Sequence, residues 1–242
     1  MLKVTPIKIY NYRARKTYPS FSSNQNGIYT LPQKTSLSLI QPPDLPWVKD
    51  EKLLSAIHRL NHVKFDSKDV KYIQSMGIVL PFQSGEEAVS FIKNSNIGVK
   101  FAKLSSVNTH ARYDFEDNCI EINEIYKDTK NPAEMLAISE AILHEAGHAK
   151  DKDNSSSLQE EIECLSLNAL SHRVFCKSFS NVFSYENSLI VKDGVCVYAD
   201  LFFDKDSSKG ALINRLRQKY GDLPAGDFRH SPSDLALRVK SR

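Results

Sequence analysis

The segment AILHEAGHAKD, residues 141–151, contains a His-Glu-x-x-His pattern inside a run with the composition of a helix. Residues four apart lie one turn apart on the same helix face, so His144 and His148 are predicted to present two imidazole nitrogens to one ion. Glu145 lies on a neighbouring side of that helix, where it can act as a general base without ligating the metal. Because zinc prefers nitrogen, sulfur and carboxylate ligands, the pattern predicts a zinc site.

The surroundings of the pattern favour this interpretation over a chance spacing of two histidines. Residues 135–143 are mostly apolar, and burying two imidazoles and a carboxylate beside them without a partner is unfavourable. Ala146 and Gly147 are small and leave room for a second element to pack against the helix. Since glycine weakens a helix by about 1 kcal/mol relative to alanine, a packing role for Gly147 is expected.

A catalytic zinc site needs a third protein ligand, and the next helical segment, LQEEIECLSLNAL (158–170), carries three glutamates. The polar loop before it is short enough to let the segment fold back on the first helix. Glu161 is favoured because the small residue Cys164 follows at i+3 and lets the two backbones approach. The alternatives that stay open are Glu160, Glu163, Asp153 and His172.

His144-Glu145-x-x-His148, followed by a glutamate-bearing helix, resembles the gluzincin-type zinc metallopeptidases. The layout is most similar to the small ImmA/IrrE-like bacterial metallopeptidases, which place a strand shortly before the motif helix, as CIEINEIYKDTKNPAEML (119–136) does here. Their following helix carries a pattern like Glu-x-Glu-Ala-Asn, where this chain reads EIECL (161–165). Cysteine and leucine depart from that pattern. The resemblance covers residues 98–176.

The resemblance implies an α+β, zincin-like metallopeptidase domain with a small antiparallel sheet. An edge strand, either ARYDF (111–115) or CIEIN (119–123), would border the cleft and pair with an extended peptide. The implied activity is that of a zinc metalloendopeptidase, which hydrolyses a protein or peptide substrate with a zinc-activated water. One catalytic Zn2+ would be held by His144, His148 and Glu161, with Glu145 as general base. Candidates to assist the reaction are Tyr113, Tyr198 and His230.

Composition sets wider limits on the function. The chain has 242 residues, 41% of them apolar and 25% charged, and a formal net charge of +3, which by itself indicates no nucleic-acid partner. No stretch is apolar enough for a membrane span, and the N-terminus lacks the features of a secretory signal. The four cysteines form no Cys-x-x-Cys pair and suit a reducing compartment. A cytoplasmic protein is expected, with export by a non-classical route as the alternative; the oligomeric state is not indicated.

Two regions are expected. Residues 1–46 are basic and rich in serine, asparagine and proline, so we interpret them as an extended arm: a flexible tail, an inhibitory pro-segment or an export signal. Residues 47–242 are expected to form a single metallopeptidase domain. Its predicted helices cover 48–63, 67–76, 84–96, 132–149, 158–175, 209–221 and 231–242, and its predicted strands 98–104, 110–115 and 118–123, with a hairpin at 188–203.

Two other functions fit the same sequence. The chain can be a catalytically silent, zinc-stabilised protein-binding module, which predicts bound metal without peptide hydrolysis. It can also be a secreted effector or toxin protease, in which the basic arm serves export or targeting.

Overall fold

The computed structural model describes residues 45–151, 157–179, 188, 190–191, 197–204, 207–219 and 223, and these form an α+β fold. The arm at 1–46, apart from its last two residues, and the helix predicted at 231–242 lie outside the described residues. The elements are α1 (Glu51–Asn61), α2 (Ser67–Ser75), α3 (Gly85–Asn94), β1 (Gly98–Ala102), β2 (Ala111–Asp114), β3 (Cys119–Asn123), η2 (Glu124–Tyr126), α4 (Pro132–Asp151), α5 (Leu158–Ser178), α6 (Val197–Phe202) and α7 (Lys209–Lys219). Among the described residues, no helix has the length and hydropathy that a bilayer crossing requires.

Capping residues explain where most helices begin. The Asp50 carboxylate accepts hydrogen bonds from the first turn of α1, and Asp66 does the same for α2. Ser84 accepts from the backbone N–H of Glu87 at 3.1 Å and so caps the first turn of α3. Asn131 accepts from the N–H of Ala133 at 2.9 Å, directly before the proline that opens α4. The predicted starts of α2, α3 and α4 are therefore confirmed to within one residue, whereas α1 begins three residues after its predicted start at 48.

The sheet is mixed, so the expectation of an antiparallel sheet was wrong. Its strand order is β1-β3-β2; β2 runs antiparallel to β3, whereas β1 runs parallel to it. The short connection between residues 115 and 118 determines only that β2 and β3 form a hairpin, and β1 can pair with either side of this hairpin in either direction. Of the two candidate edge strands, β2 lies at an edge and β3 is central.

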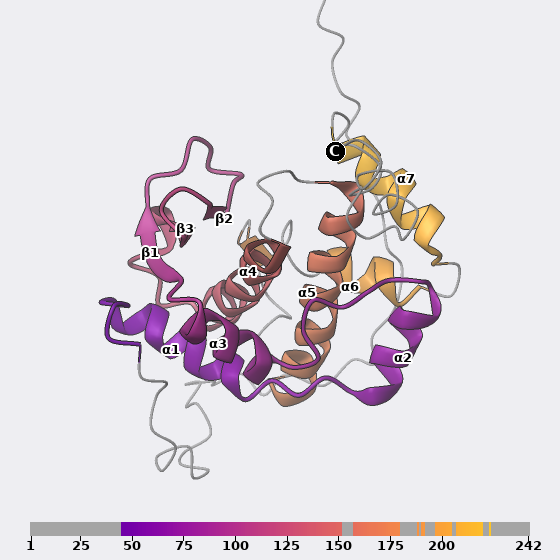
Figure 1. The fold of residues 1–242 in the computed structure, drawn as a ribbon, viewed down its shortest axis with the longest axis horizontal. Helices are drawn as coiled ribbons and strands as arrows, with labels where there is room; N and C mark the ends of the chain where they lie inside the picture. The colour runs from indigo at the N-terminus through magenta and orange to yellow at the C-terminus, as the bar shows by residue number, and fades with distance from the viewer. Residues whose placement is uncertain are drawn as a thin grey trace, which may run out of the picture. The chain divides into compact units, whose positions relative to one another are not determined.

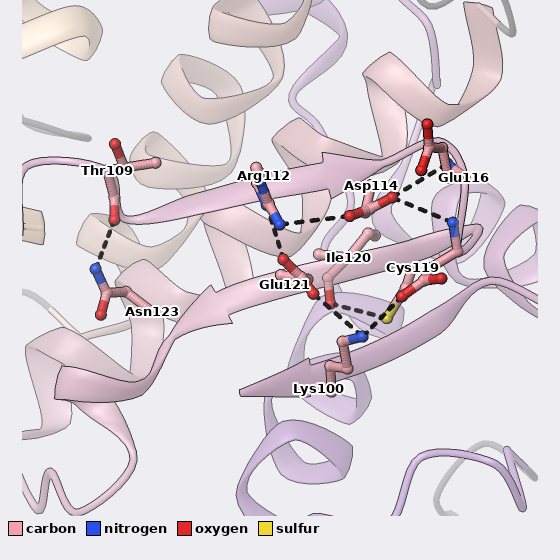
Figure 2. A network of polar contacts seen from close by, with 10 residues as sticks. Lys100, Thr109, Arg112, Asp114, Glu116, Cys119, Ile120, Glu121 and Asn123 are labelled. Carbon is pink, nitrogen blue, oxygen red and sulfur yellow. Dashed lines mark hydrogen bonds and ion pairs between the residues drawn. The ribbon is translucent and has the colours of Figure 1, made fainter. Parts of the chain in front are cut away.

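One face of the sheet carries a network of ion pairs (Figure 2). Glu121, at the centre of β3, lies opposite Lys100 on β1 and Arg112 on β2 in the strand register. Its carboxylate lies 3.1 Å from Lys100 Nζ and 2.7 Å from Arg112 Nε. The acids Asp114 and Asp117 at the hairpin end pair with the same two cations at 3.4 and 3.2 Å. Two cations thus offset two of the three negative charges of this acidic group.

The other face of the sheet is apolar and packs toward the helices. Val99 and Tyr113 flank the fully buried Ile120, and Phe101 lies beside the buried Ile122. α4 contacts β2, β3, α1, α3 and α5, and Figure 1 shows it between the sheet and α5. α4 is thus a central helix with almost no solvated face, which explains why its sequence is apolar on nearly every side.

The predicted hairpin at 188–203 is wrong in its second half. Residues 197–202 form α6, which packs against α5; the middle of the expected hairpin, residues 192–196, lies outside the described residues. Short apolar runs such as VYADLF suit a strand or a buried helical turn equally well, and here packing against α5 selects the helix.

Candidate metal centre

Two long helices, α4 and α5, build the site because they approach each other closely at one point. A Cβ atom placed on Gly147 would lie 2.7 Å from the Sγ atom of Cys164, closer than real Cβ contacts allow. A residue larger than glycine at position 147 would therefore require the Cys164 side chain or the helices to shift. The packing role expected for Gly147 is confirmed. The small residue three positions after Glu161, Cys164, is the one that faces Gly147 at this close approach.

His144, His148 and Glu161 converge at this approach. The Nε2 atoms of the two histidines lie 3.1 Å apart. Glu161 Oε2 lies 3.7 Å from His144 Nε2, and Glu161 Oε1 lies 3.5 Å from His148 Nε2. The three side chains form a group that can hold a metal ion, with ligand atoms within 4.8 Å of one another.

The two imidazoles are spaced as ligands of one small ion. Bond lengths of 2.0–2.2 Å at tetrahedral angles separate neighbouring ligand atoms by about 3.3–3.6 Å, and the two Nε2 atoms, 3.1 Å apart, are close to this spacing. Glu161 offers a different oxygen to each histidine, at 3.7 and 3.5 Å. Two imidazoles with one carboxylate are also a ligand set that zinc accepts, with a fourth position left for water or substrate. The donor set therefore fits zinc.

Glu160 supports the group without belonging to it. Its Oε1 atom lies 2.6 Å from His148 Nδ1, while its Oε2 atom accepts a hydrogen bond from the N–H of Ser157 at 3.3 Å. Ser157 Oγ accepts in turn from the N–H of Glu160, which completes a capping box at the start of α5. One carboxylate thus starts the helix and orients His148, because a proton held on Nδ1 leaves the Nε2 lone pair free for a metal.

Glu145 is buried beside the metal-ligand group, with 8% of its surface exposed. Burial raises the pKa of Glu145 to about 7, and the nearby carboxylate of Glu161 acts in the same direction. The backbone N–H of Tyr113 on β2 hydrogen-bonds this carboxylate and opposes the shift. A carboxyl group with a pKa near neutrality, held next to a metal-ligand group, is suited to accept and return a proton.

The two histidines titrate in opposite directions. Burial lowers the pKa of His144 well below its usual range, and the charge of His148 lowers it further. Burial also acts to lower the pKa of His148, but its contacts with Cys164, Glu160 and Glu145 raise it well above the usual range. In the absence of a metal, the protonated form is therefore favoured at His148.

The other residues considered from the sequence lie elsewhere. Glu163 accepts a hydrogen bond from Gln159 at 3.0 Å, and His172 lies 3.3 Å from Glu140, outside the metal-ligand group. The Tyr113 hydroxyl donates to Asn118 at 2.8 Å, so only the backbone of Tyr113 contacts the site. Asp153, the side chain of Tyr198 and His230 lie outside the described residues.

Sequence reasoning missed the orienting role of Glu160 and the contact from Tyr113. Glu160 had a local signal, because Ser157-x-x-Glu160 is a capping-box pattern that predicts an inward carboxylate at the helix start. No local sequence pattern indicates the contact from Tyr113 to Glu145, because this contact depends on how the sheet edge packs against α4.

No family model, curated protein or solved structure matches the chain.

Proposed function

We propose that the chain is a zinc-dependent metallopeptidase that hydrolyses peptide bonds in the manner of the gluzincin enzymes it resembles. The observation that supports this best is the convergence of His144, His148 and Glu161 on one point, with the buried Glu145 beside it. Each of the four side chains comes from the pattern that suggested the activity. A zincin-like domain is part of the same proposal, as is action in the cytoplasm, where the free Cys119, Cys164 and Cys176 would stay reduced.

In the proposed reaction, a bound zinc ion supplies Lewis acidity and lowers the pKa of a water molecule. His144, His148 and Glu161 would hold the ion, and Glu160 keeps His148 in the required tautomer. Glu145 takes the proton of the attacking water and delivers it to the leaving amine. The backbone N–H of Tyr113 holds the Glu145 carboxylate in position for both transfers.

An extended peptide is the substrate form that the sheet supports. β2 is an edge strand, and its neighbour on one side is β3. α4, which carries Glu145, contacts β2, so the edge strand borders the candidate centre. A peptide that adds to this edge by main-chain hydrogen bonds would run past Glu145. Main-chain recognition of this kind is tolerant of substrate sequence.

The decisive experiment compares wild-type protein with the Glu145→Gln and His144→Ala variants. Metal content of the purified proteins is measured by mass spectrometry, and hydrolysis is assayed with a library of internally quenched peptides. We expect about one zinc per chain and hydrolysis for the wild type, zinc without hydrolysis for Glu145→Gln, and loss of both for His144→Ala. Full hydrolysis by Glu145→Gln would refute the assignment of the base.

A silent, zinc-stabilised binding module is the second candidate. It is favoured by the position of the three ligand residues, which join α4 and α5 across a tightly packed helix pair, so that a bound ion would stabilise the fold itself. In that case the wild type would bind zinc and melt at a higher temperature with it, yet cleave no peptide in the library.

A further inference from the structure

A second cluster of ionisable side chains lies on the same two helices, formed by Glu140 of α4 with His172 and Cys176 of α5. Glu140 Oε1 lies 3.3 Å from His172 Nδ1, and His172 Nε2 lies 3.3 Å from Cys176 Sγ. The three groups thus form a chain from carboxylate to imidazole to thiol. None of them takes part in the proposed peptidase reaction.

The order of the groups determines what the imidazole can do. A carboxylate at Nδ1 holds the ring proton there, so the lone pair of Nε2 faces the thiol and can accept its proton. Glu140 is fully buried, and its Oε2 atom has no hydrogen-bond partner among the described residues. A carboxylate buried in this way is oriented almost entirely by the imidazole it contacts.

Cys176 differs from the other cysteines that the structure describes. Cys119 and Cys164 are buried, and burial raises the pKa of both thiols, that of Cys164 to about 12. Cys176 is partly exposed, so a small reagent can reach its sulfur. The cluster therefore combines access with an adjacent base. Cys164 also contacts a histidine, His148, but its thiol is buried.

The charged groups around Cys176 are engaged with α2. Arg173 Nε lies 2.8 Å from Asp69, and Lys177 Nζ lies 3.0 Å from Asp66. These pairs leave His172 as the base in contact with the sulfur. They also make Lys177 a useful control position, since it adjoins Cys176 in sequence and lies outside the carboxylate–imidazole–thiol chain.

The thiol end of the cluster lies away from the metal-ligand group. Glu161 and Cys176 are fifteen residues apart on α5, which corresponds to about 22 Å along a helix. Glu140 lies one turn from His144 on α4, so the test follows the reaction rate at Cys176, which is measured separately from zinc binding and peptide hydrolysis.

We propose that Cys176 is a reactive thiol, activated by His172 and Glu140, whose ligands are small disulfides. The sulfur attacks one sulfur of the disulfide RSSR while its proton passes to His172 Nε2. The S–S bond of the reagent breaks, Cys176–S–S–R forms, and the leaving thiolate RS⁻ takes the proton from His172 and departs as RSH. Two thiol–disulfide partners are exchanged with no net change in oxidation state. The expected product in a cell is a reversible mixed disulfide on α5.

The test is the pH dependence of the reaction of the intact protein with an aromatic disulfide, 5,5′-dithiobis(2-nitrobenzoate), with glutathione as the reference thiol. Labelled peptides are identified by mass spectrometry. Between pH 9 and pH 7, at and above the pKa of about 7 that burial gives Glu140, the rate for glutathione should fall by roughly 25- to 50-fold because its thiolate population falls. We expect the rate at Cys176 to fall by less than about 5-fold, since a neighbouring base assists the attack. Partial burial slows the reaction equally at both pH values, so it does not alter this ratio.

Matched variants assign the effect to the cluster. His172→Gln should restore the steep pH dependence of a free thiol, Glu140→Gln should have a smaller effect in the same direction, and Lys177→Gln should keep the wild-type ratio. Cys176→Ser should remove the label from the corresponding peptide. If His172→Gln does not fold, the wild-type ratio decides alone. A wild-type ratio equal to that of glutathione, or a folded His172→Gln variant with the wild-type ratio, would overturn the proposal.

Discussion

The carboxylate of Glu160 lies 2.6 Å from Nδ1 of His148 and at the same time closes the capping box at the start of α5. Its neighbour Glu161 points to the opposite nitrogen of the same ring, at 3.5 Å from Nε2. Two consecutive glutamates therefore act on the two sides of one imidazole. The first orients the ring, and the second completes the group that can hold a metal.

This division predicts different metal affinities for three glutamine variants. Glu160→Gln should weaken zinc binding by roughly 10- to 100-fold, as for other groups that orient a ligand, while glutamine still closes the capping box. Glu161→Gln should weaken it more, because a ligand is lost. Glu163→Gln is the control and should bind like the wild type, since Glu163 contacts Gln159 instead. Competition titration with a chelating dye measures all three, and equal affinities for Glu161→Gln and wild type would exclude Glu161 as ligand.

The contact between Gly147 and Cys164 predicts a coupled pair of substitutions. Gly147→Ala should destabilise the protein by about 1–3 kcal/mol, because the new Cβ would lie 2.7 Å from Cys164 Sγ. Removing that sulfur in Gly147→Ala/Cys164→Ala should recover most of the loss, helped by the higher helix propensity of alanine. Urea unfolding of the four proteins gives the coupling energy. If the changes in unfolding free energy of the two single variants simply add up in the double variant, residues 147 and 164 are not in contact.

Zinc binding should weaken as the pH falls. Contacts with Cys164, Glu160 and Glu145 raise the pKa of His148 well above its usual range, against the effect of burial, so a metal must displace a proton from this ring. The apparent affinity is therefore expected to rise between pH 5.5 and 8, with protons released on binding. Calorimetry in buffers of different ionisation enthalpy measures that release. An affinity that is flat over this range would contradict the assignment of His148 as a ligand.

Glu140 predicts how stability changes with pH. Burial raises the pKa of Glu140 from 4.5 to about 7, so between these values the folded protein holds a proton that the unfolded chain has lost. Its contribution to the free energy of unfolding is present below pH 4.5 and is lost as the pH rises toward 7, by on the order of 2–3 kcal/mol. Glu140→Gln should remove this part of the pH dependence and be the more stable protein at pH 8. The free energy of unfolding of the zinc-loaded wild type and of zinc-loaded Glu140→Gln is measured at pH 5, 6, 7 and 8. The same dependence of this free energy on pH in both proteins would contradict the expectation.

Much of the architecture was predicted because its signals are local. The starts of α1, α2, α3 and α4 follow from side chains that cap their own first turns, and Gly77 ends α2 with a φ of +76°. The placement of His144 and His148 on one helix face follows from the helical repeat alone. Gly147 was recognised as a packing position because glycine is unfavourable inside a helix unless something lies against it.

Other features have no local signal. The parallel pairing of β1 with β3 depends on which side of the β2–β3 hairpin β1 reaches, and the sequence of β1 is the same for either side. The helical form of residues 197–202 depends on packing against α5. The hydrogen bond from the Tyr113 backbone to Glu145 exists only because the sheet edge meets α4.

The sequence by itself determined the motif helix, the position of its two imidazoles and the acid between them, since a helix places residues four apart on one face whatever surrounds it. Only the tertiary structure decided which of three neighbouring glutamates lies at the Nε2 atoms of both imidazoles, because the rotation of α5 about its own axis is set by its packing on α4 at Gly147. It also brought Glu140 to His172 across the helix pair, a contact between residues 32 positions apart that no local pattern encodes.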